Sequence, residues 1–521
     1  MSRIPLHSPR SSALQASVLL TTVLLSLPPS ASADPAPPAA SVVATGKSPS
    51  AGTAASGKGV AVSPEIEALM QQAEALRGKG DYTAAAAKAE EVLRKQPKLV
   101  QALLFLGTLE GGQGKLDLAI GHLKQAVAAS PDNLFAHKVL ANALAQKGEA
   151  AHALEALAPV LKATPVDAQA WLLATQIEAQ RNDFAAAHRN LDKVFKAEPN
   201  NAQAHQLAVR LAMAEKKPEE AVKQLQALIR TQPDDVEAML LAASLESELG
   251  HPASAASLLE KARKTKPSAP EPVVASIQLA LRGGHPDEAA TYLPKLDALL
   301  PNVPNALSLK AEVLMAQGKA KDAIAPLEAA LAKTPDTPLF VQLHQALLAA
   351  NQTAEADKRL AAWIDSHGDD LRLRFYAAGS AGRRKDYAGA AAQYRKILEK
   401  DANNLGALND LAQTLELMKD PTSVDYAEKA YKLAPDSPVT ENTLGVILMT
   451  AGKNDRGLPL LKQAAEHAPT HPEVRFDYAR ALVVTGDKVR AKAELEALLA
   501  LKTPFAAEAG ARDMLKTLGG S

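Results

Sequence analysis

The glycine-rich run Gly107–Lys115 comes closest in this chain to a phosphate-binding loop. Such a loop needs two glycines five positions apart, followed directly by Lys and then Ser or Thr, because its backbone N–H groups and its lysine hold the phosphates. Here Leu109 stands five positions before Gly114, and Leu116 follows the lysine. We therefore predict that these glycines form a turn between two helices and not a nucleotide site.

The spacing of the serine and histidine residues also does not support a hydrolase nucleophile or a zinc site. The segment Gly379–Gly382 (GSAG) misses the Gly-x-Ser-x-Gly pattern of hydrolases by one position, so we expect a helix end or a turn there. His467 and His471 have the four-residue spacing of helical zinc ligands, but Pro469 between them prevents a shared helix face. We interpret the 12 histidines as solvated turn residues. The chain also lacks cysteine, which excludes thiolate metal ligands and cysteine nucleophiles. From these observations together we predict that the protein is not an enzyme and binds no cofactor and no metal ion.

Amide and charged side chains form a second set of residues, which could bind a partner. Gln and Asn both donate and accept hydrogen bonds, so a row of them can bind an extended partner segment. The residues predicted to bind are Lys138, Asn142, Gln176, Gln206, Arg210, Gln278, Glu312, Arg372, Asn442 and Arg480. They form one surface only if the elements that carry them repeat in register.

A proline recurs every 34 residues through most of the chain, at Pro97, Pro131, Pro165, Pro199, Pro233, Pro267, Pro301 and Pro335. An alanine recurs in phase, twelve residues before each proline, at Ala85, Ala119, Ala153, Ala187, Ala221, Ala255, Ala289 and Ala323. We call these two series the proline ladder and the alanine ladder. Because they share one period and one phase, they define a repeating unit.

Each unit is predicted to be a hairpin of two helices. In the second unit, apolar residues follow helical spacing over 102–109 and again over 118–127. Pro131 ends the second helix because it has no N–H and disfavours helical geometry in the preceding residue. The Asp or Asn that follows can cap the next helix. The in-phase alanine lies early in the second helix, where we expect the two helices to approach closely.

This unit resembles the 34-residue tetratricopeptide repeat. Small residues near position 8, such as Ala73, Gly107, Ala141 and Gly445, and the Gly-Asp-Tyr turn at 80–82 carry the likeness. The resemblance implies an all-α fold, a right-handed α-solenoid of about thirteen helix-turn-helix repeats over residues 64–521. In such arrays each repeat contacts only its neighbours.

The strict register ends after Pro335, where later units vary by one residue. Gly368 and Ala402 take the place of the proline, which then returns at Pro435, Pro469 and Pro504. We place a last helix over about 506–518, where it would cap the final apolar face.

Several stretches in the last third of the chain carry a narrower likeness. They are 405–412 (LGALNDLA), 426–435 (YAEKAYKLAP), 442–448 (NTLGVIL), 458–461 (LPLL) and 467–469 (HAP). Residues 370–517 are similar to the large tetratricopeptide protein of the PEP-CTERM/exosortase exopolysaccharide systems of Gram-negative bacteria. That family is usually lipidated and longer, whereas this chain has no cysteine and thirteen copies. The resemblance implies a periplasmic role near polysaccharide export.

The first 33 residues have the pattern of a secretory signal peptide. Arg3 and Arg10 form a positive region, 14–27 is apolar, and Ala-Ser-Ala ending at Ala33 is a cleavage site, so we predict cleavage after Ala33. The apolar run is shorter than the ~20 residues of a spanning helix. We therefore expect a periplasmic protein that is not integral to the membrane. Residues 34–63, rich in Ala, Pro and Ser, are predicted to be a disordered linker.

Charge and composition constrain the partners. Lys plus Arg total 58 and Asp plus Glu total 58, so no net field favours nucleic acid. We expect the first helices of the hairpins to line a concave groove, with positions 2, 5, 9 and 12 of each copy on its surface. The preferred hypothesis is a non-catalytic periplasmic scaffold that binds protein partners through this groove in cell-envelope or exopolysaccharide assembly or export. Self-association remains open.

The alternative hypothesis is a carbohydrate-binding or polysaccharide-modifying protein. A sugar site favours aromatic platforms, because a ring offers a flat apolar face. Aromatic residues make up only 3% of the chain, with 2 Trp, 8 Tyr and 8 Phe. We expect Trp171 at a packing position and Trp363 in a second helix, so the composition favours the scaffold.

Overall fold

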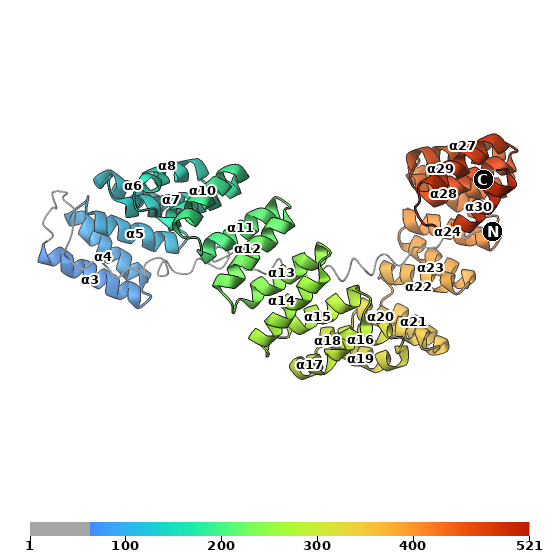
Figure 1. The fold of residues 1–521 in the computed structure, drawn as a ribbon, viewed down its shortest axis with the longest axis horizontal. Coiled ribbons are helices and arrows are strands. Elements are labelled where there is room, and N and C mark those ends of the chain that lie inside the picture. The colour runs from blue at the N-terminus through green and yellow to red at the C-terminus, as the bar shows by residue number, and fades with distance from the viewer. Residues whose placement is uncertain (1–62, 520–521) are drawn as a thin grey trace. The chain divides into compact units, whose positions relative to one another are not determined.

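The computed structural model describes residues 63–519, and helices are the only regular elements in that part of the chain (Figure 1). The helices form thirteen successive antiparallel pairs followed by one unpaired helix, which confirms the predicted number of repeats. We call the first helix of each pair the A helix and the second the B helix. The predicted signal peptide and the linker up to residue 62 lie outside the described residues.

Contacts divide the array into two compact units, which we call the N-terminal unit (63–301) and the C-terminal unit (302–519). The A helices of the N-terminal unit are α3 (Pro64–Gly78), α5 (Val100–Gly112), α7 (Leu134–Gln146), α9 (Ala168–Gln180), α11 (Ala202–Ala214), α13 (Val236–Glu248) and α15 (Glu271–Arg282). Its B helices are α4 (Tyr82–Lys95), α6 (Leu116–Ala129), α8 (Ala150–Lys162), α10 (Phe184–Ala197), α12 (Pro218–Thr231), α14 (Pro252–Thr265) and the broken pair α16 (Pro286–Thr291) and α17 (Leu293–Leu299). The break precedes Pro294, which has no N–H for the helical ladder.

The C-terminal unit repeats the same alternation. Its A helices are α18 (Pro304–Ala316), α20 (Thr337–Ala349), α22 (Leu371–Arg383), α24 (Leu405–Leu417), α26 (Pro438–Thr450) and α28 (Pro472–Val484). Its B helices are α19 (Ala320–Lys333), α21 (Thr353–Ser366), α23 (Tyr387–Lys400), α25 (Ser423–Leu433), α27 (Asn454–His467) and α29 (Lys488–Ala500). The last helix, α30 (Glu508–Thr517), buries Ala511 and Leu515 and matches the predicted capping helix.

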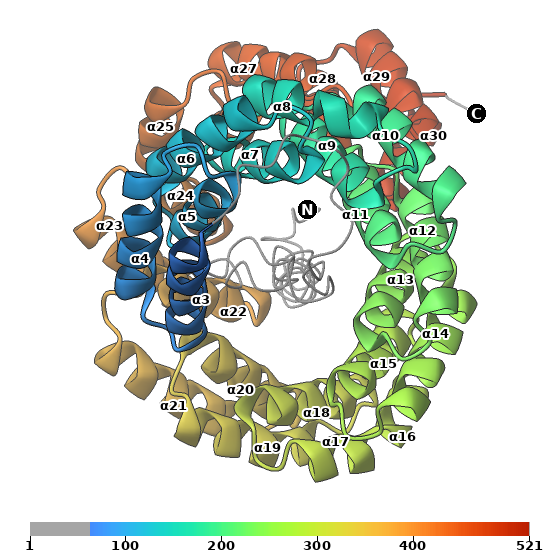
Figure 2. The ribbon, with the colours of Figure 1, turned by 90° about the vertical axis from the view of Figure 1, so that its left-hand side faces the viewer.

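The A helices face the inner side of each unit. In the N-terminal unit, α7, α9 and α11 lie inside the arc whose outer side is formed by α8, α10 and α12 (Figure 2). In the C-terminal unit, α20 and α22 likewise lie inward of α19, α21 and α23. None of the helices within 63–519 is both long enough and apolar enough to cross a membrane.

Side-chain caps start many of the A helices. The caps lie two positions after the repeating proline, where Asn133 Oδ1 accepts a hydrogen bond from the Ala136 N–H at 3.0 Å. Asn201 caps α11 in the same way, by accepting from the Ala204 N–H at 2.9 Å. Ser63 caps α3 at the start of the described chain. Such a cap satisfies an N–H that the helix itself leaves without a partner.

The alanine ladder marks the closest approach of the two helices in a repeat. All eight ladder alanines are fully buried. In the second repeat, a Cβ atom added to Gly107 would lie 2.5 Å from Leu123 Cγ and 3.3 Å from the carbonyl oxygen of Ala119. The helices α5 and α6 therefore pack with no space for a longer side chain at this level, and the predicted close approach is confirmed.

Replacing Ala119 with Leu should lower the free energy of unfolding by about 1–3 kcal/mol, because the added atoms force α5 and α6 apart. Thermal and urea denaturation followed by circular dichroism would measure the change. Gly121→Ala is the control on the same helix. Gly121 is exposed with open space around its Cα, so alanine should raise stability by up to about 1 kcal/mol. An unchanged midpoint for Ala119→Leu would contradict the close packing.

Candidate functional site

All ten predicted binding residues lie on A helices. Their exposure differs in a way that the sequence did not show. The exposed members are Asn142, Gln176, Gln206, Arg210, Glu312 and Arg372. Lys138, Gln278 and Arg480 are partly buried, and Asn442 is buried. The inner face of the A helices is therefore a surface on which some of the predicted side chains are exposed and others are covered.

Most of the predicted binding side chains that are exposed lie in the N-terminal unit. Asn142, Gln176 and Gln206 project from α7, α9 and α11, three successive A helices on the inner side of the arc (Figure 2). Amides at the second position of neighbouring A helices also contact each other. Gln169 Nε2 on α9 donates to Gln203 Oε1 on α11 at 2.8 Å, and the two residues are 34 positions apart. Amides on successive A helices therefore lie within reach of one another, as binding to one extended segment requires.

Lys138 is partly committed to a structural bond. Its Nζ lies 2.7 Å from Asp167 Oδ2, and Asp167 also caps α9 through the Ala170 N–H. Burial works to raise the pKa of Asp167, but the hydrogen bonds from Lys138 and Ala170 outweigh it and hold that pKa below its usual value. Lys138 thus ties α7 to the start of α9, and a partner would have to share it.

Two charged residues on A helices are exposed in part and shielded from water in part. Surrounding protein lowers the pKa of Arg210 and raises the pKa of Glu312, in both cases through burial. Burial disfavours the charged form of each group. A cationic partner group would offset that cost at Glu312, so this residue is suited to binding.

The predicted exposure of the inner face is wrong at three positions. Positions 2, 5, 9 and 12 of each copy were expected on the groove surface, but where these positions hold Ser244, Asn442 and Phe476 the residue is buried. Phe476 belongs to the apolar core closed by α30, and Asn442 Nδ2 donates to Asp477 Oδ2 at 3.1 Å. The reason is that neighbouring A helices pack on each other and cover part of the face that an isolated hairpin would expose.

The interpretation of the histidines as solvated turn residues is wrong for several of them. Six lie inside helices and not at a helix end, and two of these, in A helices, are also buried: His122, His137, His152 and His188, and the buried His205 and His344. His344 occupies a position where most other repeats have Ala or Gly, and a hydrogen bond of 2.7 Å joins its Nδ1 to the hydroxyl of Tyr376. Burial lowers the pKa of His344 to about 4, so the imidazole is neutral near pH 7. It is enclosed and therefore no base for an external substrate.

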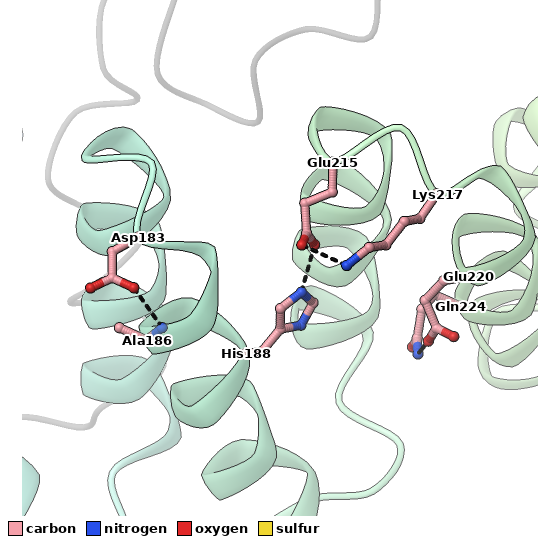
Figure 3. A network of polar contacts seen from close by, with 7 residues as sticks. All are labelled: Asp183, Ala186, His188, Glu215, Lys217, Glu220 and Gln224. Atoms are coloured by element: carbon pink, nitrogen blue, oxygen red, sulfur yellow. Dashed lines mark hydrogen bonds and ion pairs between the residues drawn. The ribbon is translucent and has the colours of Figure 1, made fainter.

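A histidine–glutamate pair ties two successive repeats together. His188 on α10 reaches forward to Glu215 at the end of α11, with 2.6 Å between Nε2 and Oε2 (Figure 3). Lys217 binds the other carboxylate oxygen of Glu215 at 2.7 Å. The hydrogen bonds from Lys217 and His188 lower the pKa of Glu215. Within residues 63–519, no three His, Asp or Glu side chains gather as metal ligands, and this pair connects neighbouring helices.

The two tryptophans do not form open platforms. Trp171 packs against the core between α9 and α11. Trp363, on the B helix α21, is stacked between Phe340 and His367, with ring centroids 4.6 Å and 4.3 Å away and nearly parallel planes. Both faces of its indole are occupied, so it offers no free face to a sugar ring.

The repeats define the class of the protein as an α-helical repeat array, and family models specify it further. Models of the tetratricopeptide repeat match residues 112–177, 178–245 and 448–509 in one version and residues 70–133 and 274–338 in another. Together these matches cover more than half of the chain. The chain belongs to the tetratricopeptide repeat family, whose members in general are non-catalytic scaffolds that mediate protein–protein interactions.

Curated relatives share parts of the array. The chain is 29% identical over 181 residues to cellulose synthase operon protein C of Komagataeibacter sucrofermentans, which is 33% of this chain and 13% of that protein. It is 28% identical over 143 residues to a TPR repeat-containing protein of Pseudomonas aeruginosa, which is 25% of this chain and 23% of that protein. The chain thus matches well under a third of the length of either relative. The first likeness supports the resemblance to repeat proteins of exopolysaccharide systems.

Solved structures also align with parts of this chain. A tetratricopeptide repeat protein from Parabacteroides merdae is 21% identical, with 49% of this chain and all of that chain covered and a TM-score of 0.35. Yeast Tom70 is 15% identical, with 82% and 95% of the two chains covered and a TM-score of 0.37.

His344 should make the C-terminal unit less stable in acid. Its pKa is about 4 in the folded chain and 6.5 in the unfolded one, so the unfolded chain binds more protons between these values. Lowering the pH from 6.5 to 4 should therefore reduce the free energy of unfolding by roughly 3 kcal/mol through this residue. In a Trp171→Phe background, the fluorescence of Trp363 would report unfolding near His344.

His344→Gln is the variant that removes this titration, and its stability should fall less steeply over the same pH range. His285→Gln, at an exposed histidine, should retain the steeper dependence of the unchanged protein. Equal slopes for His344→Gln and the unchanged chain would show that the buried imidazole does not carry the effect.

Proposed function

We propose that this chain is a non-catalytic periplasmic scaffold that binds protein partners along the inner face of its A helices, in exopolysaccharide or cell-envelope assembly or export. The observation that carries the proposal is the row of exposed amides Asn142, Gln176 and Gln206 on three successive A helices. These side chains offer both donors and acceptors to the main chain of an extended segment. Arg210, Glu312 and Arg372 add charges on the same kind of surface.

The pathway is proposed from resemblance. Cellulose synthase operon protein C belongs, by its name, to a polysaccharide synthesis operon. The sequence stretches within 370–517 resemble a tetratricopeptide protein of exopolysaccharide systems, and the first 33 residues have the pattern of an export signal. These three features together favour a place beside the machinery that makes or exports a polysaccharide.

Binding to proteins is favoured over binding to the polymer itself. The stacked environment of Trp363 and the packed position of Trp171 remove the largest rings from use as sugar platforms. The exposed inner face is instead rich in amides and single charges. An extended peptide matches this surface, because its N–H and C=O groups alternate along the chain.

Changing Asn142, Gln176 and Gln206 together to Ala should lower partner capture at least tenfold while leaving helical circular dichroism and the melting midpoint unchanged. The loss follows from removing amides that only a partner uses. Cross-linking of the exported protein in cell envelopes, followed by affinity recovery and mass spectrometry, would measure capture. Gln125→Ala with Lys193→Ala, two exposed B-helix positions on α6 and α10, is the matched control.

Recovery of the same envelope proteins by the unchanged chain and the B-helix control, and not by the A-helix variant, is the expected result. Equal recovery by all three would place the binding surface elsewhere and overturn the proposal. A lower melting midpoint for the A-helix variant would show that these amides stabilise the fold.

A further inference from the structure

Three successive A helices near the end of the array carry polar side chains at their sixth position, where most earlier A helices carry apolar ones. The sixth residue is Phe105 in α5, Val139 in α7, Leu173 in α9, Leu207 in α11 and Leu241 in α13. The helices α24, α26 and α28 place Asp410, Thr443 and Asp477 there, and Asn409 and Asn442 directly precede the first two; we call these five residues the C-terminal polar cluster. Each of them is less than one-tenth exposed.

Hydrogen bonds join the cluster across the three helices. Gln413 Nε2 on α24 donates to Thr443 Oγ1 on α26 at 3.0 Å. Asn442 Nδ2 on α26 donates to Asp477 Oδ2 on α28 at 3.1 Å. Neighbouring helices of this series pack directly on each other. The cluster is therefore one continuous polar strip and not three separate substitutions.

The cluster has more acceptors than donors. The side-chain oxygens of Asn409 and Asn442 are buried, and neither accepts a hydrogen bond from the described residues. Leaving such atoms without a partner costs free energy, so buried polar atoms nearly always have one. The buried carboxylate of Asp477 lies in the same strip. A ligand that brings N–H donors and positive charge would satisfy both deficits.

One cation of the chain already covers part of the strip. Arg480 Nη1 lies 3.1 Å from Asp477 Oδ1, and the Arg480 side chain remains 39% exposed. Its guanidinium also lies 5.9 Å from the Phe476 ring centre. Burial still raises the pKa of Asp477 despite the hydrogen bonds from Asn442 and Arg480, and the nearby Glu473 raises it further. The carboxylate is thus incompletely compensated, and the arginine beside it is partly exposed.

We propose that the C-terminal polar cluster binds a basic side chain, the ammonium of Lys or the guanidinium of Arg, from a partner segment, and that Arg480 holds this place in the free protein. The assignment deepens the scaffold proposal and rests on it for the existence of a protein partner. Lys offers three N–H donors and Arg five. Such a group can pair with Asp477 and also donate to the unused oxygens of Asn409 and Asn442.

Removing Arg480 should strengthen binding, which separates this role from that of an ordinary contact residue. The probes are capped peptides of sequence Ser-Gly-Ser-X-Ser-Gly-Ser, in which X is Arg, Lys, citrulline or norleucine, titrated by calorimetry into the full chain. We expect the Arg and Lys peptides to bind at least tenfold more tightly than the citrulline and norleucine peptides. Arg480→Ala should raise the affinity for the Arg and Lys peptides by about tenfold, because the competing cation is absent.

Asp477→Asn should abolish the preference for charged peptides and keep the shape of the site. Arg395→Ala, at an exposed arginine on the B helix α23, is the control and should behave like the unchanged chain. Melting curves of every variant separate binding from folding. The assignment would be overturned if all four peptides bound equally, or if the Arg peptide bound more weakly to the Arg480→Ala variant than to the unchanged chain.

A lower melting midpoint for Arg480→Ala with no gain in affinity would also overturn the assignment, since it would make Arg480 purely structural. The two proposals fail separately in these experiments. Discrimination among the peptides without capture of any envelope protein would refute the scaffold and leave the basic-group site. Capture of envelope proteins without discrimination would do the reverse.

Discussion

The close approach of A and B helices at the alanine ladder is the constraint on which the rest of the structure depends. The ladder alanines are fully buried in every strict repeat, and Gly107 meets Ala119 and Leu123 with no space for a Cβ atom. Close packing within each hairpin keeps consecutive hairpins similar in shape. Because repeats within one compact unit then stack in a similar way, equivalent residues 34 positions apart become neighbours.

That neighbour relation gives the inner face its chemistry. Gln169 bonds Gln203, and Ser308 Oγ bonds Gln342 Oε1 at 2.6 Å, both across one period of the chain. The A helix of a single hairpin contributes only a few exposed side chains. Under the proposed function a partner would be bound by the sum of modest contacts along the row, through residues that the stacking of repeats leaves exposed.

The sequence predicted the fold well because its signals are local. The repeating proline follows the end of the second helix and the in-phase alanine permits close packing, so thirteen hairpins and a last helix could be counted from the spacing of these two residues. The candidate site was predicted less well because exposure depends on the neighbouring repeat. Asn142 and Asn442 both lie on A-helix positions assigned to the groove, yet the first is exposed and the second is enclosed between α26 and α28. His344 was misjudged for the same reason, since nothing local marks a histidine in a small-residue position as buried.

The difference between Asn142 and Asn442 also separates affinity from specificity. An exposed amide loses little when a partner leaves, because water replaces the lost hydrogen bonds. A buried carboxylate such as Asp477, beside amide oxygens with no donor, gains little from a neutral partner and much from a cation. Exposed amides on α7, α9 and α11 therefore suit tolerant binding of an extended chain. The C-terminal polar cluster suits a choice between partners, because a segment without a basic group would leave its acceptors unpaired.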